Sequence, residues 1–540
     1  MEFNLADLFE NAVDHFGERE VLVAEGERRT YAEMEQRANR LAHHLAANGI
    51  GHGDHVGIYA YNCVEWVETA WAVFKIRATW ININYRYVED ELRYLFDNAD
   101  LKALVYQREF ADRVRGVRDG LPDLTHSVVI DDGSDTDLAG LDSEPYESAM
   151  ASGSPERDFA PRSPDDLYIL YTGGTTGMPK GVMWRHEDVF MALGGGIDAQ
   201  TGVRVERPED LVDKAYDAPL KFFFIAPLMH GATQWGLMGQ TFIGNTVNLV
   251  ARFDPERAWD LIEHEGVNAM MITGDAMGRP LIEVLEAHPG RWDTSSLFSL
   301  SSSAALFSPS VKDRWFAQFP DLILTDSIGA SESGNNGMTI VTKDSTAMKE
   351  GPTVTPLAGS VVLDPETMEE IPPGDDRLGM VARKGDLPIG YYKDPEKTAA
   401  TFVTAPNGTR YSMPGDFARR HADGTITLVG RGSASINSGG EKIFPEEVES
   451  AVKSHPSIYD VTVVGVPDER WGSRVAAVVQ LREGEDVPEL ADLQDHCRTV
   501  IAGYKVPREI HVVDEVVRAP SGKPDYRWAQ DLARAASAGG

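Results

Sequence analysis

The segment from Leu170 to His186, LYTGGTTGMPKGVMWRH, combines residue types that bind phosphate. Four glycines, three threonines and Lys180 lie between two apolar segments. Backbone N–H groups, threonine hydroxyls and one ammonium are the donors that surround a triphosphate. A glycine-rich surface turn is the alternative reading, but the density of donors favours a phosphate loop.

Two familiar kinds of phosphate loop do not match this segment. A Walker-type loop has glycine directly before its lysine and serine or threonine directly after it, whereas Pro179 precedes Lys180 and Gly181 follows it. A dinucleotide-binding loop needs Gly-x-Gly-x-x-Gly at the start of a helix, and GGTTGMPKG has another spacing. We therefore expect a mobile loop of a third kind.

The composition limits the ligands and partners of such a site. A chain of 540 residues is expected to form two or more domains. Its net charge of −34 argues against nucleic acid or an anionic membrane as the main partner. A polyanionic ligand must therefore be held by local cations, helix N-termini or Mg²⁺.

The compartment is predicted from what the sequence lacks. No apolar run is long enough to span a bilayer, and the acidic N-terminus MEFNLADLFE does not resemble a signal peptide. The two cysteines, Cys63 and Cys497, exclude a disulfide framework and a cysteine-ligated zinc site. These features are typical of a cytoplasmic protein without an integral membrane segment; a homodimer is left open.

Helices and strands alternate through most of the chain. Thr30 and Glu33 form a capping-box pattern at the start of a predicted helix that Gly49 can end. A strand over 55–60 and a helix near 66–76 come next. Further strands are predicted over 104–107, 127–130, 167–172 and 268–273. This alternation predicts an α/β fold with largely parallel sheets in layers.

The pattern changes after about residue 430. A stretch dense in glycine and serine precedes Pro445, a residue suited to the first turn of a helix. A strand over 461–466, a helical stripe over 490–501 and a strand over 509–516 follow. We predict a core domain over 1–430, a hinge at 431–433 and a small mobile α+β domain over 434–540.

Five segments, in this order, resemble the motifs of the adenylate-forming superfamily of acyl-CoA synthetases, luciferases and adenylation domains. They are the phosphate loop (171–181), an adenine and magnesium segment (326–332), a ribose segment (411–416), a hinge segment (430–449) and a catalytic-lysine segment (520–527). Together they cover nearly the whole chain. YTGGTTGMPKGVMWRHED and PLMHGATQW look most like actinobacterial steroid-side-chain CoA ligases and related fatty-acyl-CoA synthetases.

The resemblance implies a reaction in two steps, with ATP and coenzyme A as co-substrates and Mg²⁺ as the metal ion. A carboxylate attacks the α-phosphate of ATP to give an acyl-adenylate and pyrophosphate, and a thiol then displaces AMP. Lys523 would bridge the carboxylate and the α-phosphate as a compact cation, and Glu332 would hold Mg²⁺. His230 would guard the acyl tunnel, with an ordinary core histidine as the alternative.

The resemblance also implies the remaining binding residues. Contacts to the phosphates are assigned to Thr172, Gly173, Gly174, Thr175, Thr176, Gly177 and Lys180. Contacts to adenine and ribose are assigned to Asp326, Ser331, Asp416 and Arg431. Contacts to the pantetheine arm are assigned to Gly439 and Gly440, and the pivot to Ser433. The acyl-pocket candidates are Trp235, Gly274, Ser303, Ala304 and Leu306. A turn after Gly415 is the alternative for Asp416.

The sequence departs from the superfamily at several positions without losing a core chemical residue. Ile328 replaces the aromatic residue that stacks on adenine. Ser302 and Ser303 replace paired glycines beside the acyl pocket, Pro414 replaces a threonine, and Gly173 replaces a hydroxyl residue. The shape and polarity of the acyl pocket are therefore open.

Three functions compete. The leading hypothesis is an ATP-dependent acid–CoA ligase for a bulky or long apolar carboxylate, either a steroid side chain or a fatty acid. The second keeps adenylation but passes the acyl group to a carrier-protein thiol or, as in luciferases, to O₂. The third is a silent acyl or nucleotide sensor.

Overall fold

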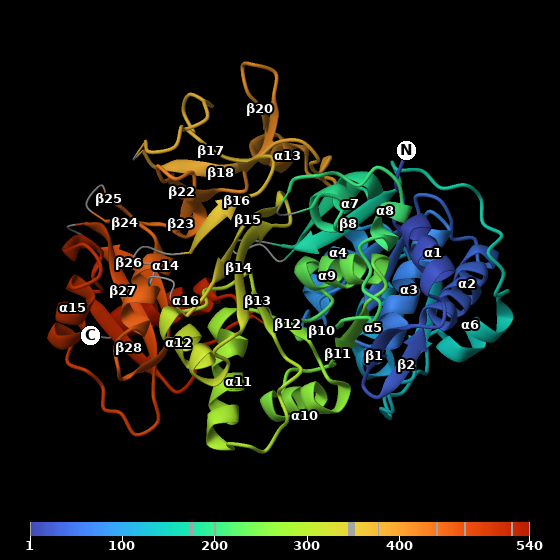
Figure 1. The fold of residues 1–540 in the computed structure, drawn as a ribbon, viewed down its shortest axis with the longest axis horizontal. Coiled ribbons are helices and arrows are strands. Elements are labelled where there is room, and N and C mark those ends of the chain that lie inside the picture. Colours follow the sequence, from blue (N-terminus) through green and yellow to red (C-terminus); the bar gives the residue numbers. More distant parts are fainter. Residues whose placement is uncertain are drawn as a thin grey trace.

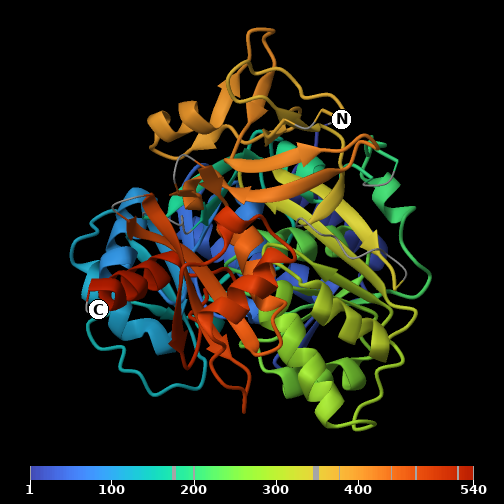
Figure 2. The same cartoon turned by 90° about the vertical axis from the view of Figure 1, so that its left-hand side faces the viewer.

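The computed structural model describes residues 2–172, 178–198, 201–343, 352–375, 377–438, 441–468, 471–519 and 522–538. A large domain runs from the N-terminus to the strands drawn in orange, and a small domain, drawn in red, follows it (Figure 1). Figure 2 shows the small domain lying across one side of the large one. This architecture confirms the predicted α/β core with a small α+β domain.

One sheet of the large domain is mostly parallel and buried on both faces. Its order is β19 (Gly390–Tyr391), β9 (Lys180–Arg185), β8 (Leu167–Thr172), β4 (Thr79–Asn82), β3 (His55–Tyr59), β5 (Leu101–Gln107), β6 (His126–Ile130) and β7 (Glu144–Pro145). Helices α4 (Glu89–Asn98) and α5 (Ala111–Arg118) share a core with one face. Every residue of β3 is buried, as expected for a parallel strand covered on both sides.

The second sheet is parallel from β1 to β14, with the antiparallel strand β2 at its edge, and becomes antiparallel after β14. Its order is β2 (Glu27–Thr30), β1 (Glu20–Ala24), β11 (Thr246–Leu249), β10 (Lys221–Phe224), β12 (Ala269–Ile272), β13 (Ser299–Ser302), β14 (Ile323–Ala330), β15 (Gly334–Val341) and β16 (Thr353–Pro356). It continues through β23 (Ile426–Arg431), β22 (Asp416–Arg420), β18 (Gly379–Arg383), β21 (Arg410–Ser412) and β20 (Phe402–Thr404), with β17 (Ser360–Leu363) beside β18. The predicted parallel strands are confirmed, whereas the antiparallel portion was not predicted.

Helices join the two sheets into one body. A shared core takes residues from α1 (Leu5–Phe16), α2 (Tyr31–Ala47), α3 (Val64–Lys75), α7 (His186–Leu193) and α9 (Gly231–Phe242). The predicted capping box of Thr30 and Glu33 is present at the start of α2. A second core lies under α10 (Pro255–Glu265), α11 (Gly274–Ala287) and α12 (Pro309–Gln318). Shorter helices are α6 (Tyr146–Ser152), α8 (Glu209–Val212) and α13 (Pro395–Thr401).

The small domain starts where the second sheet ends. After β23, a short 3-10 helix, Gly432–Ala434, leads into the hairpin of β24 (Ile436–Ser438) and β25 (Glu441–Ile443). A sheet of β26 (Ile458–Asp468), β27 (Gly472–Leu481) and β28 (Glu509–Val513) follows, with helices α14 (Pro445–Lys453), α15 (Leu490–Arg498) and α16 (Tyr526–Ala538). Pro445 opens α14, as predicted. In the described part of the chain, no helix combines the length and apolar character needed to cross a bilayer.

Candidate active site

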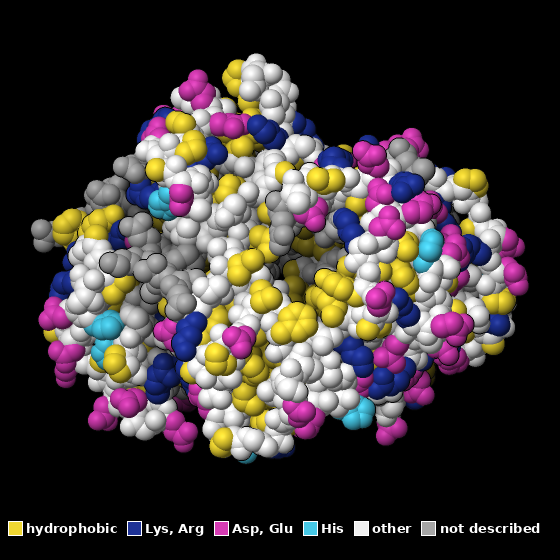
Figure 3. Space-filling view, in the orientation of Figure 1, with side chains coloured by type: hydrophobic (Ala, Val, Ile, Leu, Met, Phe, Trp, Pro, Cys, Tyr) yellow, Lys and Arg dark blue, Asp and Glu magenta, His cyan; other side chains and the backbone are white. Residues whose placement is uncertain are grey.

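A cavity of about 1350 Å³ lies between the two domains. From the large domain it is lined by Thr172, Met191, His230, Trp235, Ser303, Ala304, Ile328 and Ser331. From the small domain it is lined by Ala434, Ile436, Val464, Lys523 and Tyr526. Figure 3 shows a hollow near the middle of this face, with hydrophobic side chains beside it and acidic ones spread around the margin. The cavity exceeds the roughly 300–1,000 Å³ of an ordinary ligand pocket, so it has room for more than one small molecule.

Lys523 reaches this cavity from a tight turn of the small domain. The Ala519 N–H donates to the Lys523 carbonyl at 2.9 Å, and Arg518 Nη1 donates to the Gly522 carbonyl at 3.1 Å. Arg518 is itself fixed by a bidentate ion pair with Asp460 on β26, at 2.5 and 2.6 Å. The turn is thus held to the sheet of its own domain and presents the lysine to the other domain.

The turn meets the large domain at Gly522. This glycine has φ +72°, and a Cβ built on it would lie 2.9 Å from the Ala276 Cβ and 3.1 Å from the Thr273 carbonyl oxygen. Ala276 stands in the first turn of α11, and Thr273, directly before this helix, lines the cavity. Only a residue without a side chain fits this backbone conformation and this approach together.

The ammonium of Lys523 stands among charges of both signs. Burial lowers the pKa of Lys523 and the Arg431 guanidinium lowers it further, while Glu332 and Asp416 act in the opposite direction. Its side chain is accessible from the cavity, and among the described residues none accepts a hydrogen bond from it. A cation in a cavity, without an acceptor in the described part of the chain, is placed to meet an anionic ligand.

His230 precedes α9 and borders the same space. Burial lowers its pKa to about 3, with further lowering by Lys523 and Arg86, so the imidazole is neutral at ordinary pH. Its Nε2 is buried and has no hydrogen-bond partner in the described structure. A buried polar atom without a partner is costly. Its place in the cavity wall favours the ligand-facing role over that of a satisfied core histidine.

Glu332 and Asp416 are both held by neighbouring side chains. Tyr391, the last residue of β19, donates its hydroxyl to Glu332 Oε1 at 2.8 Å. Arg431 Nε donates to Asp416 Oδ1 at 2.8 Å across the paired strands β22 and β23. Asp416 therefore sits in a strand beside an arginine rather than in a simple turn, and the two predicted sugar-binding residues lie side by side.

Other predicted residues have different surroundings. Lys180 forms an ion pair with Asp394, the residue that caps α13. Asp326 is buried and paired with Lys312; burial raises the pKa of Asp326, although Lys312 beside it acts to lower it. Asp326 is not part of the described cavity wall. Its contact with adenine stays a prediction.

The acyl-pocket candidates divide into two groups. Trp235, Ser303 and Ala304 line the cavity, whereas Gly274 and Leu306 do not. Gly274, with φ +51°, begins α11, and a Cβ on it would lie 2.3 Å from the Leu306 carbonyl oxygen. The structure therefore explains Gly274 by close backbone packing at the start of α11.

Several predicted positions lie outside the described residues. These are Gly173, Gly174, Thr175, Thr176 and Gly177 of the phosphate loop, and Gly439 and Gly440 of the hinge segment. Ser433 lies in the 3-10 helix between the two domains. Thr172 and Ser331, from the edges of these motifs, do line the cavity.

The sequence reasoning missed residues that act on the site from a distance. Tyr391 orients Glu332, Arg518 and Asp460 fix the lysine turn, and Lys312 pairs with Asp326. A tyrosine after glycine in PIGYYKDP carries no distinctive signal of its own. The lysine-turn pair could have been suspected from Arg518 immediately before APSGKP, but its carboxylate partner lies 58 residues away.

Comparison with known proteins agrees with this geometry. Residues 9–392 match the AMP-binding enzyme family, and residues 447–523 match the AMP-binding enzyme C-terminal domain. The 3-oxocholest-4-en-26-oate–CoA ligase of Rhodococcus rhodochrous is 52% identical, covering 98% of this chain and 96% of the relative. A medium/long-chain-fatty-acid–CoA/3-oxocholest-4-en-26-oate–CoA ligase of Mycolicibacterium smegmatis is 49% identical, covering 98% and 97%.

A solved structure shares the whole fold. The crystal structure of the anthranilate CoA ligase AuaEII in complex with anthranoyl-AMP aligns with a TM-score of 0.83 at 22% identity, over 100% of this chain and 98% of that one. The family match extends over most of the large domain, and the curated relatives are similar from end to end. The chain therefore belongs to the AMP-binding enzyme family.

Proposed function

We propose that this chain is an AMP-forming ligase that uses ATP to join a bulky or long apolar carboxylic acid to coenzyme A. The observation that carries the proposal is the ammonium of Lys523, which has no hydrogen-bond acceptor among the described residues and is delivered by the small domain into the cavity that His230 borders. Glu332 and Asp416 act on the same ammonium. One cation supplied by the small domain, with two carboxylates held near it, suits a reaction in which two anions must meet.

In the first step a carboxylate oxygen attacks the α-phosphorus of ATP, and the bond from that phosphorus to the pyrophosphate oxygen breaks. Both reactants are negative, so the barrier falls when a fixed cation lies between them. Lys523 supplies that cation, and neutral His230 offers its unpartnered ring nitrogen near the carboxylate. Asp416, positioned by Arg431, accepts hydrogen bonds from the ribose hydroxyls.

Glu332 would hold Mg²⁺, which neutralises phosphate charge when it is bound. The fit rests on the donor set: Tyr391 orients the carboxylate through Oε1, which leaves Oε2 for the ion. Mg²⁺ is held in such sites by one or two carboxylates together with substrate phosphates and water. Glu332 supplies that carboxylate.

The acid substrate is proposed from the apolar part of the cavity. Four methionines line it together with Trp235: Met178, Met191, Met229 and Met271. Methionine side chains are unbranched and polarizable and fill irregular spaces, so such a wall accommodates both flexible and rigid apolar groups. The two curated relatives named for sterol side-chain and fatty acids support the same substrate range.

In the second step the coenzyme A thiol attacks the acyl carbonyl and AMP leaves. We propose that the small domain rotates about residues 431–433 for this step, with Gly439 and Gly440 beside the pantetheine arm. Transfer to a carrier-protein thiol would use the same acyl-adenylate, so an experiment must distinguish coenzyme A from a carrier protein as the acceptor.

The test is a panel of acids from medium-chain fatty acids to sterol side-chain carboxylates, assayed for AMP release with and without free coenzyme A. We expect AMP and acyl-CoA to form together, in equal amounts, only when ATP, acid and coenzyme A are all present. AMP release that is the same with and without coenzyme A would point to another acceptor. Absence of pyrophosphate release with every acid would refute the proposal.

A further inference from the structure

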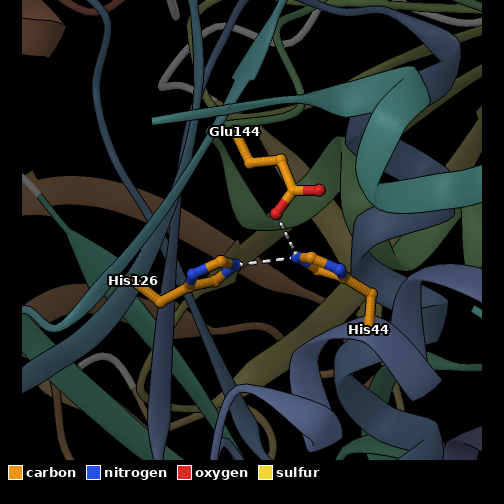
Figure 4. Close-up of side chains that lie close together, drawn as sticks. All are labelled: His44, His126 and Glu144. Carbon is orange, nitrogen blue, oxygen red and sulfur yellow. Dashed lines mark hydrogen bonds and ion pairs between the residues drawn. The ribbon is translucent and has the colours of Figure 1, made fainter. Parts of the chain in front are cut away.

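Three side chains outside the cavity bring their donor atoms to one point. His44 lies on α2, His126 begins β6 and Glu144 begins β7, so the group joins a helix to the edge of the first sheet. Figure 4 shows the two rings and the carboxylate turned toward one another. None of the three lines the cavity between the domains. The reaction proposed above gives them no role.

The distances resemble those between the ligands of one metal ion. The two Nε2 atoms are 2.9 Å apart, His44 Nε2 and Glu144 Oε2 are 3.5 Å apart, and all three donor atoms lie within 4.8 Å of one another. Two nitrogens bound to zinc at roughly 2.05 Å with a tetrahedral angle would be about 3.4 Å apart. A movement of about half an ångström between the rings therefore gives this separation, and the Glu144 carboxylate, whose oxygen lies within 4.8 Å of both nitrogens, completes the set by turning toward His126.

The hydrogen bonds around His44 decide which of its nitrogens carries the proton. The Ser152 hydroxyl donates to the Ala149 carbonyl at 2.8 Å, so its oxygen accepts from His44 Nδ1, also at 2.8 Å. His44 thus carries its proton on Nδ1. Its Nε2 lone pair faces His126 Nε2 at 2.9 Å, Asn48 Nδ2 at 3.4 Å and Glu144 Oε2 at 3.5 Å. A nitrogen without a proton is the form of the imidazole that binds metal.

His44 Nε2 lies 2.9 Å from His126 Nε2 and 3.5 Å from Glu144 Oε2, and a cation placed among the three would replace the contact between the rings and neutralise the carboxylate. Metal-bound histidines are usually oriented by a hydrogen bond from the ring nitrogen that does not bind the metal. Ser152 orients the His44 ring in this way through Nδ1. We propose that His44, His126 and Glu144 bind one divalent transition-metal ion of the zinc type. Two imidazoles and one carboxylate form a set that zinc accepts, with a fourth position for water.

The ion would tie α2 to the outer strands β6 and β7. His44 is buried, whereas Glu144 has a side chain 37% exposed, so the ion has a route from solvent. Because binding favours the folded state, the metal would raise the thermal stability of the N-terminal sheet. A metal site at this position would change the stability of the fold and leave the chemistry of the cavity unchanged.

The test uses untagged full-length protein stripped of metal by a chelator and titrated with Co²⁺, followed by displacement with Zn²⁺. We expect one equivalent of Co²⁺ to give the visible d–d bands of a four-coordinate site, and Zn²⁺ to abolish them and raise the Tm. His126→Ala should lose both effects. Ser152→Ala should keep the bands but weaken affinity about 10–100-fold, as outer-shell changes do.

The matched control is His43→Ala, on the same helix. His43 pairs with Asp158 at 2.8 Å and belongs to no such group among the residues described, so this variant should bind Co²⁺ as the wild type does. Should His126→Ala not fold, Glu144→Gln replaces it, since that change keeps the shape and removes the carboxylate. Bands that are missing from the wild type, or that persist unchanged in both ligand variants, would show that the group is only a hydrogen-bonded histidine pair.

Discussion

Gly522 controls whether the lysine turn can dock on the large domain. In the Gly522→Ala variant, the added Cβ would lie 2.9 Å from the Ala276 Cβ and 3.1 Å from the Thr273 carbonyl oxygen. It would also occupy a backbone with φ +72°, which strains any residue that has a side chain. The contact joins the two domains and would be lost in the proposed rotation of the small domain, whereas the strain belongs to the turn itself.

The two effects have different magnitudes and different readouts. The left-handed conformation costs about 1–2 kcal/mol, which appears mainly as lost stability. Overpacking at the contact costs about 1–3 kcal/mol and acts on closure alone. Expressed as a rate, that is roughly a 5- to 150-fold loss of adenylation. Thioester formation from preformed acyl-adenylate should change little, because the proposed second step does not use this contact.

The assay measures pyrophosphate release for the first step and acyl-CoA formation from synthetic acyl-adenylate for the second. Gly484→Ala is the matched control, since Gly484 lies in the same domain with φ +79° and nothing within 4 Å of its Cβ. It should lose stability without losing adenylation. Ala276→Gly combined with Gly522→Ala should restore part of the rate. Equal losses in both half-reactions, or the same loss in the control, would refute the role of the contact.

Three further predictions concern other parts of the site. Lys523→Ala should abolish adenylate formation and spare the thioester step, as half-reaction assays would show; equal losses in both would contradict its role. Burial, and then Arg431, lowers the pKa of Lys523, so the lysine loses its charge at a lower pH than usual. The pH profile of kcat/KM for adenylation should therefore fall on the alkaline side, and Lys523→Arg should remove this alkaline fall if the variant keeps measurable activity. Although burial acts to raise it, Lys453 and Arg518 hold the pKa of Asp460 below its ordinary value, so its stabilisation is present above the unfolded-state pKa and is lost as pH falls. Asp460→Asn should cost about 3–5 kcal/mol in urea unfolding at neutral pH and flatten the acid dependence, and an unchanged midpoint would contradict the ion pair's importance.

The parts of the fold that local pattern controls could be predicted from sequence. The helix predicted after Thr30 is α2, and the strand predicted over 55–60 is β3, because spacing and capping depend on neighbouring residues. The antiparallel strands from β16 to β23 escaped prediction. They are short and joined by turns of varied length, and their pairing depends on residues as far apart as Thr353 and Thr427.

The same distinction holds for the site. Lys523, Asp416 and Arg431 could be named from motifs, and the structure places Asp416 and Arg431 in contact with one another. The ion pair of Asp326 with Lys312 could not be anticipated, because a carboxylate's partner depends on how a helix crosses a strand. Gly274 was assigned to the acyl pocket on the same kind of motif, yet its surroundings are backbone.

In the proposed rotation of the small domain, Arg431 and its partner Asp416 would lie close to the axis. Displacement in a rotation grows with the radius from the axis, and Arg431 stands directly before the 3-10 helix of residues 432–434. The groups beside the nucleotide's sugar would therefore stay almost still, whereas Lys523 would sweep a wide arc. A single chain could in this way hold AMP in place while it withdraws the cation and makes room for a thiol.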